Sequence, residues 1–276
     1  MALKLMYITN RPEIARIAES AGVDRIFVDL EYIGKDVRQG GLDTVQSHHT
    51  LNDIVDIKKT IKTSELLVRC NPIHDKCDEY SSSEEEIEAV IKDGADIVML
   101  PYFKTVAEVK RFIGCVGGRV KTMLLVETPE AVSVIDDILE INGIDEVFIG
   151  LNDLSLGYGK KFMFELLADG TVESLCNKFR ARGLSYGFGG IASLGHGTLP
   201  SELIIQEHYR LHSSEVILSR SFCDVSHIDD LDKVKTVFVN GVREIRDFEK
   251  QCEKDAVSFA ENHKQVVKKV KEILEF

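Results

Sequence analysis

Residues 122–127 read TMLLVE, and residues 146–153 read EVFIGLND. Each stretch is a short apolar run followed by an acid, Glu127 in the first and Asp153 in the second. A buried parallel strand reads as such a run, so the acid that follows it is expected at the carboxyl edge of a sheet. Two acids at neighbouring strand ends predict a site for a hard cation such as Mg²⁺, which takes one or two protein carboxylates and leaves its other positions to water and substrate.

Similar apolar runs recur along the whole chain, separated by helical patterns. Eight strands are predicted, at 4–9, 25–29, 66–69, 97–100, 123–127, 147–150, 185–188 and 216–218. Helices are predicted at 12–22, 51–62, 83–93, 106–116, 129–141, 162–182 and 200–211. Strands that alternate with helices indicate βαβ units and a parallel sheet. Eight such units predict an α/β fold of one (β/α)₈ TIM barrel.

A doubly wound open sheet is the competing architecture. It would lead us to expect a glycine-rich fingerprint after the first strand, but residues 9–12 read TNRP. We therefore assign residues 1–228 to a barrel core and residues 229–276 to a long C-terminal helical extension of the same domain. The extension is either an eighth helix with an exposed tail or an oligomerisation arm.

Composition limits the classes of partner. The chain has 276 residues, a formal net charge of −12 and a pI of about 5.2. An acidic surface argues against nonspecific nucleic-acid binding and against docking on anionic membranes. The six cysteines form no CxxC pair, and no signal peptide is evident at the start. We expect reduced thiols and a cytoplasmic location.

Charged residues collect at the predicted carboxyl ends of the strands, where barrel enzymes have their active sites. The acids are Asp29, Glu31, Glu127 and Asp153, and the arginines are Arg69 and Arg220. A glycine-rich stretch at 187–197 precedes the last strand. Since barrels often bind phosphate near strands seven and eight, Arg220 is predicted to bind a phosphate or carboxylate end of the substrate.

Four phrases follow one another at intervals that resemble a known family. They read VDLE at 28–31, LVR at 67–69, VETPEA at 126–131 and FIGLNDLS at 148–155. Over roughly residues 4–225 the chain resembles the metal-dependent 2-oxo acid aldolases and citrate lyase β-subunits of the pyruvate/phosphoenolpyruvate barrel superfamily. The resemblance implies a carbon–carbon lyase acting next to a small 2-oxo acid through a metal-stabilised, pyruvate-like enolate. It also implies a homo-oligomer, a trimer or hexamer.

The resemblance also implies roles for individual residues. Glu127 and Asp153 would bind Mg²⁺, Mn²⁺ or Co²⁺, and Arg69 would face the keto oxygen. Backbone N–H groups at Leu151 and Asn152 would bind the substrate carboxylate. This agrees with the chemistry, because breaking a carbon–carbon bond beside a 2-oxo acid leaves an enolate whose charge a cation and an arginine stabilise.

One departure concerns the general base. Pyruvate-type aldolases have a histidine after the acid of strand two, and this chain has Tyr32. Tyrosine is a poor base near neutrality, with a reference pKa of about 10. We predict His48 or His49 as the replacement and contact of Glu31 with a metal-bound water. As structural alternatives, Glu127 and Asp153 would cap helices, Arg69 would pair with a structural acid, and the loop histidines would be solvent-exposed.

Other functions remain open from the sequence. A citrate lyase-type acyl-CoA lyase is one, although no adenine-binding signature is evident. A metal-dependent phosphodiesterase would call for a histidine pair near the first strands, which end in Thr9-Asn10 and Asp29-Leu30-Glu31. Tyr32 favours a third class, an inert barrel that works as a binding or assembly protein.

Overall fold

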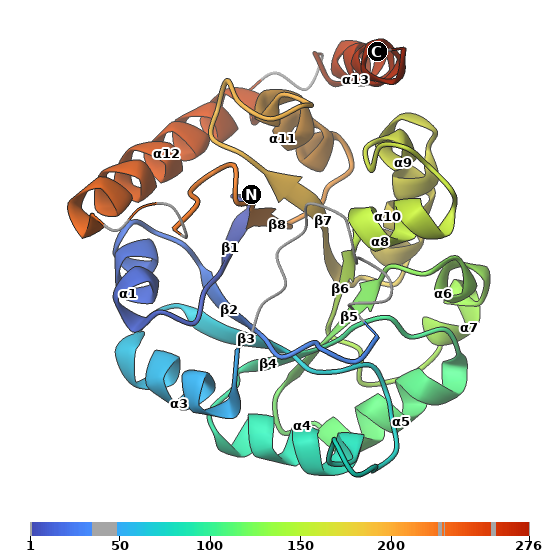
Figure 1. The fold of residues 1–276 in the computed structure, drawn as a ribbon. Coiled ribbons are helices and arrows are strands. Elements are labelled where there is room, and N and C mark those ends of the chain that lie inside the picture. The colour runs from blue at the N-terminus through green and yellow to red at the C-terminus, as the bar shows by residue number, and fades with distance from the viewer. Residues whose placement is uncertain (1, 35–48, 226–227, 229, 255–257, 276) are drawn as a thin grey trace.

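The computed structural model describes residues 2–34, 49–225, 228, 230–254 and 258–275, which form a closed barrel of eight parallel strands (Figure 1). The strands are β1 (Lys4–Ile8), β2 (Arg25–Asp29), β3 (Glu65–Arg69), β4 (Ile97–Leu100), β5 (Lys121–Val126), β6 (Glu146–Ile149), β7 (Ser185–Ile191) and β8 (Glu215–Leu218). Each strand pairs with its neighbour in sequence, and β8 closes on β1. The predicted (β/α)₈ barrel is confirmed.

Helices surround the barrel. They are α1 (Pro12–Ser20), α3 (Leu51–Thr60), α4 (Ser83–Lys92), α5 (Val106–Val116), α6 (Pro129–Ser133), α7 (Ile135–Ile138), α8 (Leu151–Gly157), α9 (Glu165–Ala168), α10 (Thr171–Ala181), α11 (Ser201–Arg210), α12 (Leu231–Cys252) and α13 (Phe259–Leu274). None of these helices has the length and apolar character needed to cross a membrane. The helix predicted at 162–182 is two helices, because Asp169 accepts hydrogen bonds from Thr171 and turns the chain between them.

The strands are apolar on both faces because each face packs in a different core. Alternate residues such as Ile26 and Val28 pack outward against the helices. Phe27, Phe148 and other inward-facing residues fill the barrel. This two-sided burial is what makes parallel strands nearly continuous apolar runs.

The C-terminal extension forms the two helices α12 and α13. α12 packs beside α1, and α13 packs against α11 and α9 of the same chain. Val234, Phe238, Val242 and Ile245 of α12 are buried. Glu249 of α12 accepts a hydrogen bond from the backbone N–H of Leu3, so the extension is tied to the start of the barrel. The oligomerisation arm stays a prediction.

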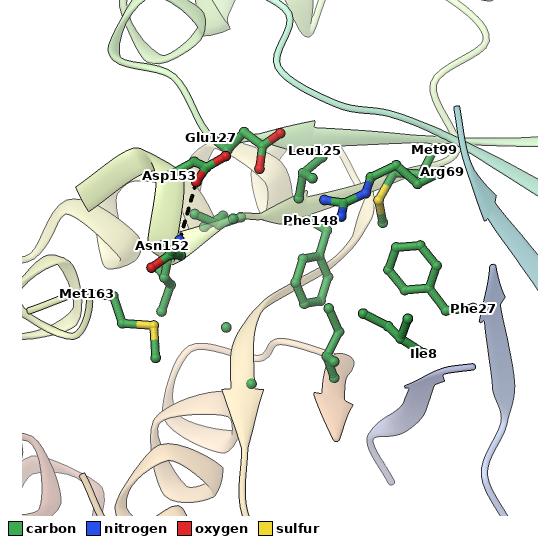
Figure 2. A pocket seen from close by; sticks show the side chains of 16 residues that line it. Ile8, Phe27, Arg69, Met99, Leu125, Glu127, Phe148, Asn152, Asp153 and Met163 are labelled. Atoms are coloured by element: carbon green, nitrogen blue, oxygen red, sulfur yellow. Dashed lines mark hydrogen bonds between the residues drawn. The ribbon is translucent and has the colours of Figure 1, made fainter. Parts of the chain in front are cut away.

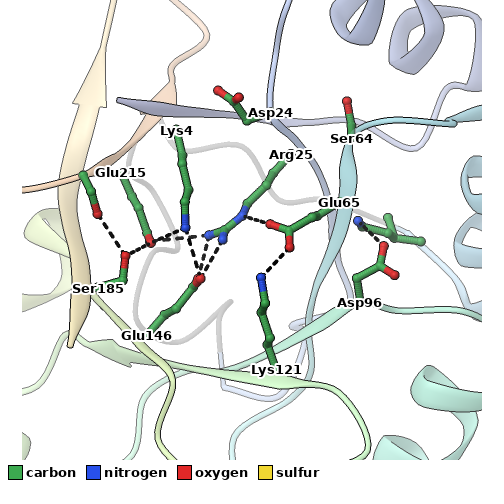
Figure 3. A network of polar contacts seen from close by, with 12 residues as sticks. Lys4, Asp24, Arg25, Ser64, Glu65, Asp96, Lys121, Glu146, Ser185 and Glu215 are labelled. Atoms are coloured by element: carbon green, nitrogen blue, oxygen red, sulfur yellow. Dashed lines mark hydrogen bonds and ion pairs between the residues drawn. The ribbon is translucent and has the colours of Figure 1, made fainter. Parts of the chain in front are cut away.

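The amino-terminal end of the barrel contains an ionic layer whose centre, formed by Arg25, Glu146 and Glu215, is buried (Figure 3). Its members are the first residues of seven strands: Lys4, Arg25, Glu65, Lys121, Glu146, Ser185 and Glu215. Arg25 is fully buried, and its two terminal nitrogens lie 2.7 Å from the two Glu146 carboxylate oxygens. Arg25 also donates to Glu65 at 2.9 Å and lies 3.5 Å from Glu215.

Glu215 makes this layer sensitive to pH. Burial, with the Glu146 charge, raises the pKa of Glu215 from 4.5 to about 7. Because the folded chain holds this proton more tightly than the unfolded chain, the contribution of Glu215 to stability falls as pH rises from about 4.5 to about 7. We expect the Glu215→Gln variant to lack this pH dependence. Its free energy of unfolding should therefore fall less than that of the wild type over this range, by up to about 3 kcal/mol at 1.36 kcal/mol per pKa unit.

Urea unfolding of the wild type and the Glu215→Gln variant across this pH window measures the effect. The control is Glu65→Gln, since Glu65 is a partly exposed acid of the same layer whose pKa is lowered in the fold. That variant should lose stability at neutral pH. Parallel pH profiles for wild type and Glu215→Gln would contradict the prediction.

Candidate active site

Glu127 lies inside the barrel mouth and does not cap a helix. It follows β5 directly and is 4% exposed. The N-cap of α6 is Thr128, whose hydroxyl accepts a hydrogen bond from the Ala131 backbone N–H at 3.1 Å. The alternative that Glu127 is a surface capping acid is therefore wrong.

Asp153 comes from the short helix α8, which was not predicted. It is the third residue of that helix and is 8% exposed. The N-cap position is occupied by Gly150, so Asp153 is not the cap. Asn152 donates to Asp153 Oδ1 through its side-chain amide at 3.3 Å. Figure 2 shows Asp153 beside Glu127 at one side of a cavity.

Gly150 allows the end of β5, with Glu127, to lie close to the start of α8. A Cβ at this position would lie 2.8 Å from both Cβ and Oε2 of Glu127, closer than real Cβ contacts. Any other residue would therefore displace the Glu127 side chain. The requirement for glycine at this position is steric. In the sequence it is visible as the glycine of the FIGLND stretch.

The environment of Glu127 disfavours a lone negative charge. Burial raises the pKa of Glu127 well above its ordinary value, and the charges of Glu31 and Asp153 add to this effect. Arg69 offsets part of it, as does the Tyr102 backbone N–H, which donates to Glu127 Oε1 at 2.9 Å. Tyr102 has a φ of 47°, a left-handed conformation that is uncommon for a residue with a side chain.

Arg69 forms two hydrogen bonds with an acid on the neighbouring strand. Its Nε and Nη2 donate to the two Asp29 carboxylate oxygens at 2.8 and 2.7 Å. Its Nη1 lies 3.3 Å from Glu31, and the guanidinium lies 5.6 Å from the centre of the Phe27 ring. Although burial alone would lower it, Asp29 and Glu31 raise the pKa of Arg69 well above its ordinary value. Arg69 therefore pairs with Asp29 and also lines the cavity described below, so this pairing is compatible with the predicted role toward the keto oxygen, and Asp29 positions its guanidinium.

These side chains meet at a cavity of about 220 Å³ (Figure 2). Glu127, Asp153, Asn152 and Arg69 form its polar part, and Leu151 also lines it. A second cavity of about 230 Å³ lies against the same acid pair, next to Tyr102, Thr128 and Leu156. Glu127 and Asp153 therefore line two cavities.

The acid cluster has the chemistry of a cation site. Asp29, Glu31, Glu127 and Asp153 are all buried, and Arg69 is the cation that pairs with two of them. Buried carboxylates close together are the oxygen ligands that a hard divalent cation binds. Within the described ranges, no three His, Cys, Asp or Glu side chains converge as a complete ligand set. The pair Glu127 and Asp153 suits a hard cation that takes few protein ligands.

The family model described as HpcH/HpaI aldolase/citrate lyase matches residues 4–168. This chain belongs to the HpcH/HpaI aldolase/citrate lyase family. The match covers more than half of the chain and includes both Glu127 and Asp153. No curated protein matches the chain.

Solved structures of HpcH/HpaI proteins and of a citrate synthase share the fold. An HpcH/HpaI aldolase from Desulfitobacterium hafniense DCB-2 has a TM-score of 0.62 at 17% identity, covering 89% of this chain and 93% of that one. An HpcH/HpaI aldolase/citrate lyase family protein from Burkholderia cenocepacia J2315 has a TM-score of 0.60 at 13% identity, with coverages of 85% and 95%. Citrate synthase SbnG has a TM-score of 0.58 at 14% identity, with coverages of 89% and 94%.

Two residues predicted for the site of this HpcH/HpaI chain lie elsewhere. His49 is buried rather than solvent-exposed, and its Nδ1 accepts a hydrogen bond from the Asp29 backbone N–H at 3.0 Å. It lines a separate hollow together with Tyr32 and His74. Arg220 is exposed and is not part of the cavity lining. His48 lies outside the described residues.

The predicted general base is therefore not found among the cavity-lining residues that the structure describes. Among the residues that the structure describes, no histidine lines the cavity that holds Glu127 and Asp153. Glu31 is buried against Arg69, at the edge of the acid cluster. Its position agrees with an electrostatic effect on Glu127.

Proposed function

We propose that this chain is a carbon–carbon lyase that depends on a divalent metal and acts next to a 2-oxo acid. The observation that carries the proposal is the buried Glu127–Asp153 pair, which faces one cavity together with Arg69. Membership in the HpcH/HpaI aldolase/citrate lyase family supports a lyase. Mg²⁺ is the metal that we propose, with Mn²⁺ and Co²⁺ as substitutes.

Each side chain has a role in this proposal. Glu127 and Asp153 would hold the cation, which when bound supplies Lewis-acid stabilisation of negative charge on a substrate oxygen. Arg69 would direct a permanent positive charge at the keto oxygen. Asp29 would fix the plane of that guanidinium through its two hydrogen bonds. Preorganised charge of this kind stabilises an enolate without reorganisation during the reaction.

The start of α8 would bind the substrate carboxylate. Leu151 and Asn152 are the first two residues of the helix, and both line the cavity. The first backbone N–H groups of a helix have no acceptor within that helix. A carboxylate beside them would complete their hydrogen bonding, and the side-chain amide of Asn152 lies next to Asp153.

Exchange of the pyruvate methyl protons with D₂O tests the proposal directly. We expect proton NMR to show loss of the methyl signal when Mg²⁺ is present and no enzyme-dependent loss after treatment with EDTA. This measurement needs no knowledge of the second substrate. Wild-type protein that binds Mg²⁺ and pyruvate without exchanging protons would support the inert-barrel alternative.

Arg69→Lys separates charge from geometry. Lysine keeps the positive charge but loses the planar fork to Asp29. We expect kcat for exchange to fall about 100-fold or more, as when one preorganised donor is removed. Thermal unfolding of the same variant checks that the barrel is intact. An exchange rate within threefold of wild type would mean that Arg69 has only a structural role.

A further inference from the structure

The wall of the cavity away from the acid pair consists of apolar side chains. Ile8 ends β1, Phe27 lies within β2, and Ile217 lies within β8. All three line the cavity, and Figure 2 shows Ile8 and Phe27 on the opposite side from Glu127. Met163 closes another side. The cavity therefore has a charged half and an apolar half.

The polar side chains of the lining come from one half only. Arg69 lies on β3, Glu127 follows β5, and Asn152 and Asp153 lie on α8. The strands β1, β2 and β8 contribute only apolar side chains to the lining. A hydroxyl group placed against that wall would lose its hydrogen bonds to water and gain no partner among the side chains that these three strands contribute, which is costly.

Strand β7 leaves space next to this wall. Gly189 and Gly190 line the cavity and contribute no side chain. Gly189 has a φ of 58°, and a Cβ there would lie 2.9 Å from Leu151, so the position strongly favours glycine. The register between β7 and β8 is irregular between Gly187 and Gly190. Such irregularities re-aim a strand near active sites.

The volume exceeds what pyruvate needs. An apolar cavity of about 150 Å³ is large enough to bind benzene, which has six non-hydrogen atoms. Pyruvate also has six non-hydrogen atoms, and the cavity here measures about 220 Å³. Room remains for a short chain beyond the carbon next to the keto group when the water ligands of the cation lie in the second cavity, which also borders Glu127 and Asp153.

We propose that the substrate is a 2-oxo acid whose chain beyond the reacting carbons is apolar and lies against Ile8, Phe27 and Ile217. This inference rests on the proposed lyase function and specifies its substrate class. The carboxylate and keto group occupy the charged half of the cavity. The hydrocarbon end occupies the apolar half over Gly189 and Gly190, which excludes sugar-like chains that carry several hydroxyl groups.

A ligand series tests the inference by affinity. Calorimetry on the full chain with saturating Mg²⁺ would compare pyruvate, 2-oxobutanoate, 2-oxopentanoate and 2-oxohexanoate. We expect the affinity to rise about fourfold for each added methylene until the wall is covered. The length-matched polar probe is 4-cyano-2-oxobutanoate, which ends in a polar nitrile nitrogen where 2-oxohexanoate ends in a methyl and which, unlike a 5-hydroxy acid, does not close into a ring on the keto carbon. It should bind about tenfold more weakly than 2-oxohexanoate or worse.

A matched pair of variants tests whether the apolar wall causes the difference in affinity between the apolar and the polar probe. Ile217→Val removes one carbon and keeps the surface apolar. Ile217→Thr gives a side chain of almost the same shape as valine, but with a hydroxyl in place of one methyl group. We expect Ile217→Val to retain most of the discrimination between the two length-matched probes. Ile217→Thr should reduce it by at least threefold. Equal discrimination in the two variants would contradict the inference.

The outcomes separate this inference from the proposed function. Tight binding that grows with chain length, without metal-dependent exchange at C3, would overturn the lyase and leave the apolar pocket in place. Exchange with pyruvate together with affinities that stay flat or fall along the series would overturn the pocket and leave the lyase in place. No binding of any 2-oxo acid would overturn both.

Discussion

Glu127→Gln and Asp153→Asn are each expected to reduce metal-dependent pyruvate proton exchange more than about 100-fold. Loss of residues that merely orient metal ligands already costs 10–100-fold, and these substitutions remove proposed ligands. Gln and Asn keep the size of the side chain and leave an acceptor oxygen, so the Tyr102 N–H still has a partner at position 127. Exchange rates at saturating Mg²⁺, measured by NMR, give the result.

The stability of the metal-free protein should change in the opposite direction for Glu127→Gln. Burial and the neighbouring acids disfavour the charged form of Glu127 in the fold. A neutral amide removes that cost, so the unfolding temperature should rise by about 2–4 °C for each kcal/mol gained. The control is Glu130→Gln, three residues away and exposed on α6. It should leave both exchange and unfolding temperature nearly unchanged, whereas lower stability together with lower activity for Glu127→Gln would indicate a damaged fold.

Arg25→Met should destabilise the barrel by about 3–5 kcal/mol, the usual cost of removing one partner of a buried ion pair. Arg25 is fully buried and pairs with Glu146 while lying 3.5 Å from Glu215. Without the guanidinium, two buried carboxylates would face each other, and Lys4 would be the cation close to both among the residues that the structure describes. Urea unfolding should show the loss as a lower midpoint.

Two further variants qualify this result. Arg111→Met removes an arginine that pairs with Glu84 and Asp75 at the surface, and it should cost less than about 1 kcal/mol. Arg25→Met combined with Glu146→Gln should recover part of the lost stability, because one unpaired charge is removed. A loss below about 1 kcal/mol for Arg25→Met alone would show that the ionic layer does not stabilise the fold.

The barrel and its acid pair were predictable because they depend on local pattern. Apolar runs before Glu127 and Asp153 predict strands, and the carboxyl ends of neighbouring parallel strands lie at one edge. The pairing of Arg69 with Asp29 follows from the same logic, since these two residues are direct register partners on adjacent strands. The sequence alone suggests an acid as the partner of Arg69 but does not specify which one.

The remaining features depend on contacts between distant residues. In the sequence, a single charged residue at the start of a strand looks like an ordinary solvent-exposed strand end. Only closure of the barrel brings Arg25 within reach of Glu146 and Glu215. The direction of His49 toward the Asp29 backbone depends on how the chain approaches α3, which the sequence pattern does not specify. The close contact of Gly150 with Glu127 likewise requires the packing of β5 beside α8.

A crystal structure with Mn²⁺ and oxalate, a stable mimic of the pyruvate enolate, is the decisive measurement for the metal site. Anomalous scattering locates the metal independently of the protein coordinates. We expect one strong peak within coordination distance of both Glu127 and Asp153, with oxalate on the side of Arg69. A peak that contacts neither carboxylate, or a cavity that binds oxalate without metal, would rule out the proposed metal-dependent site.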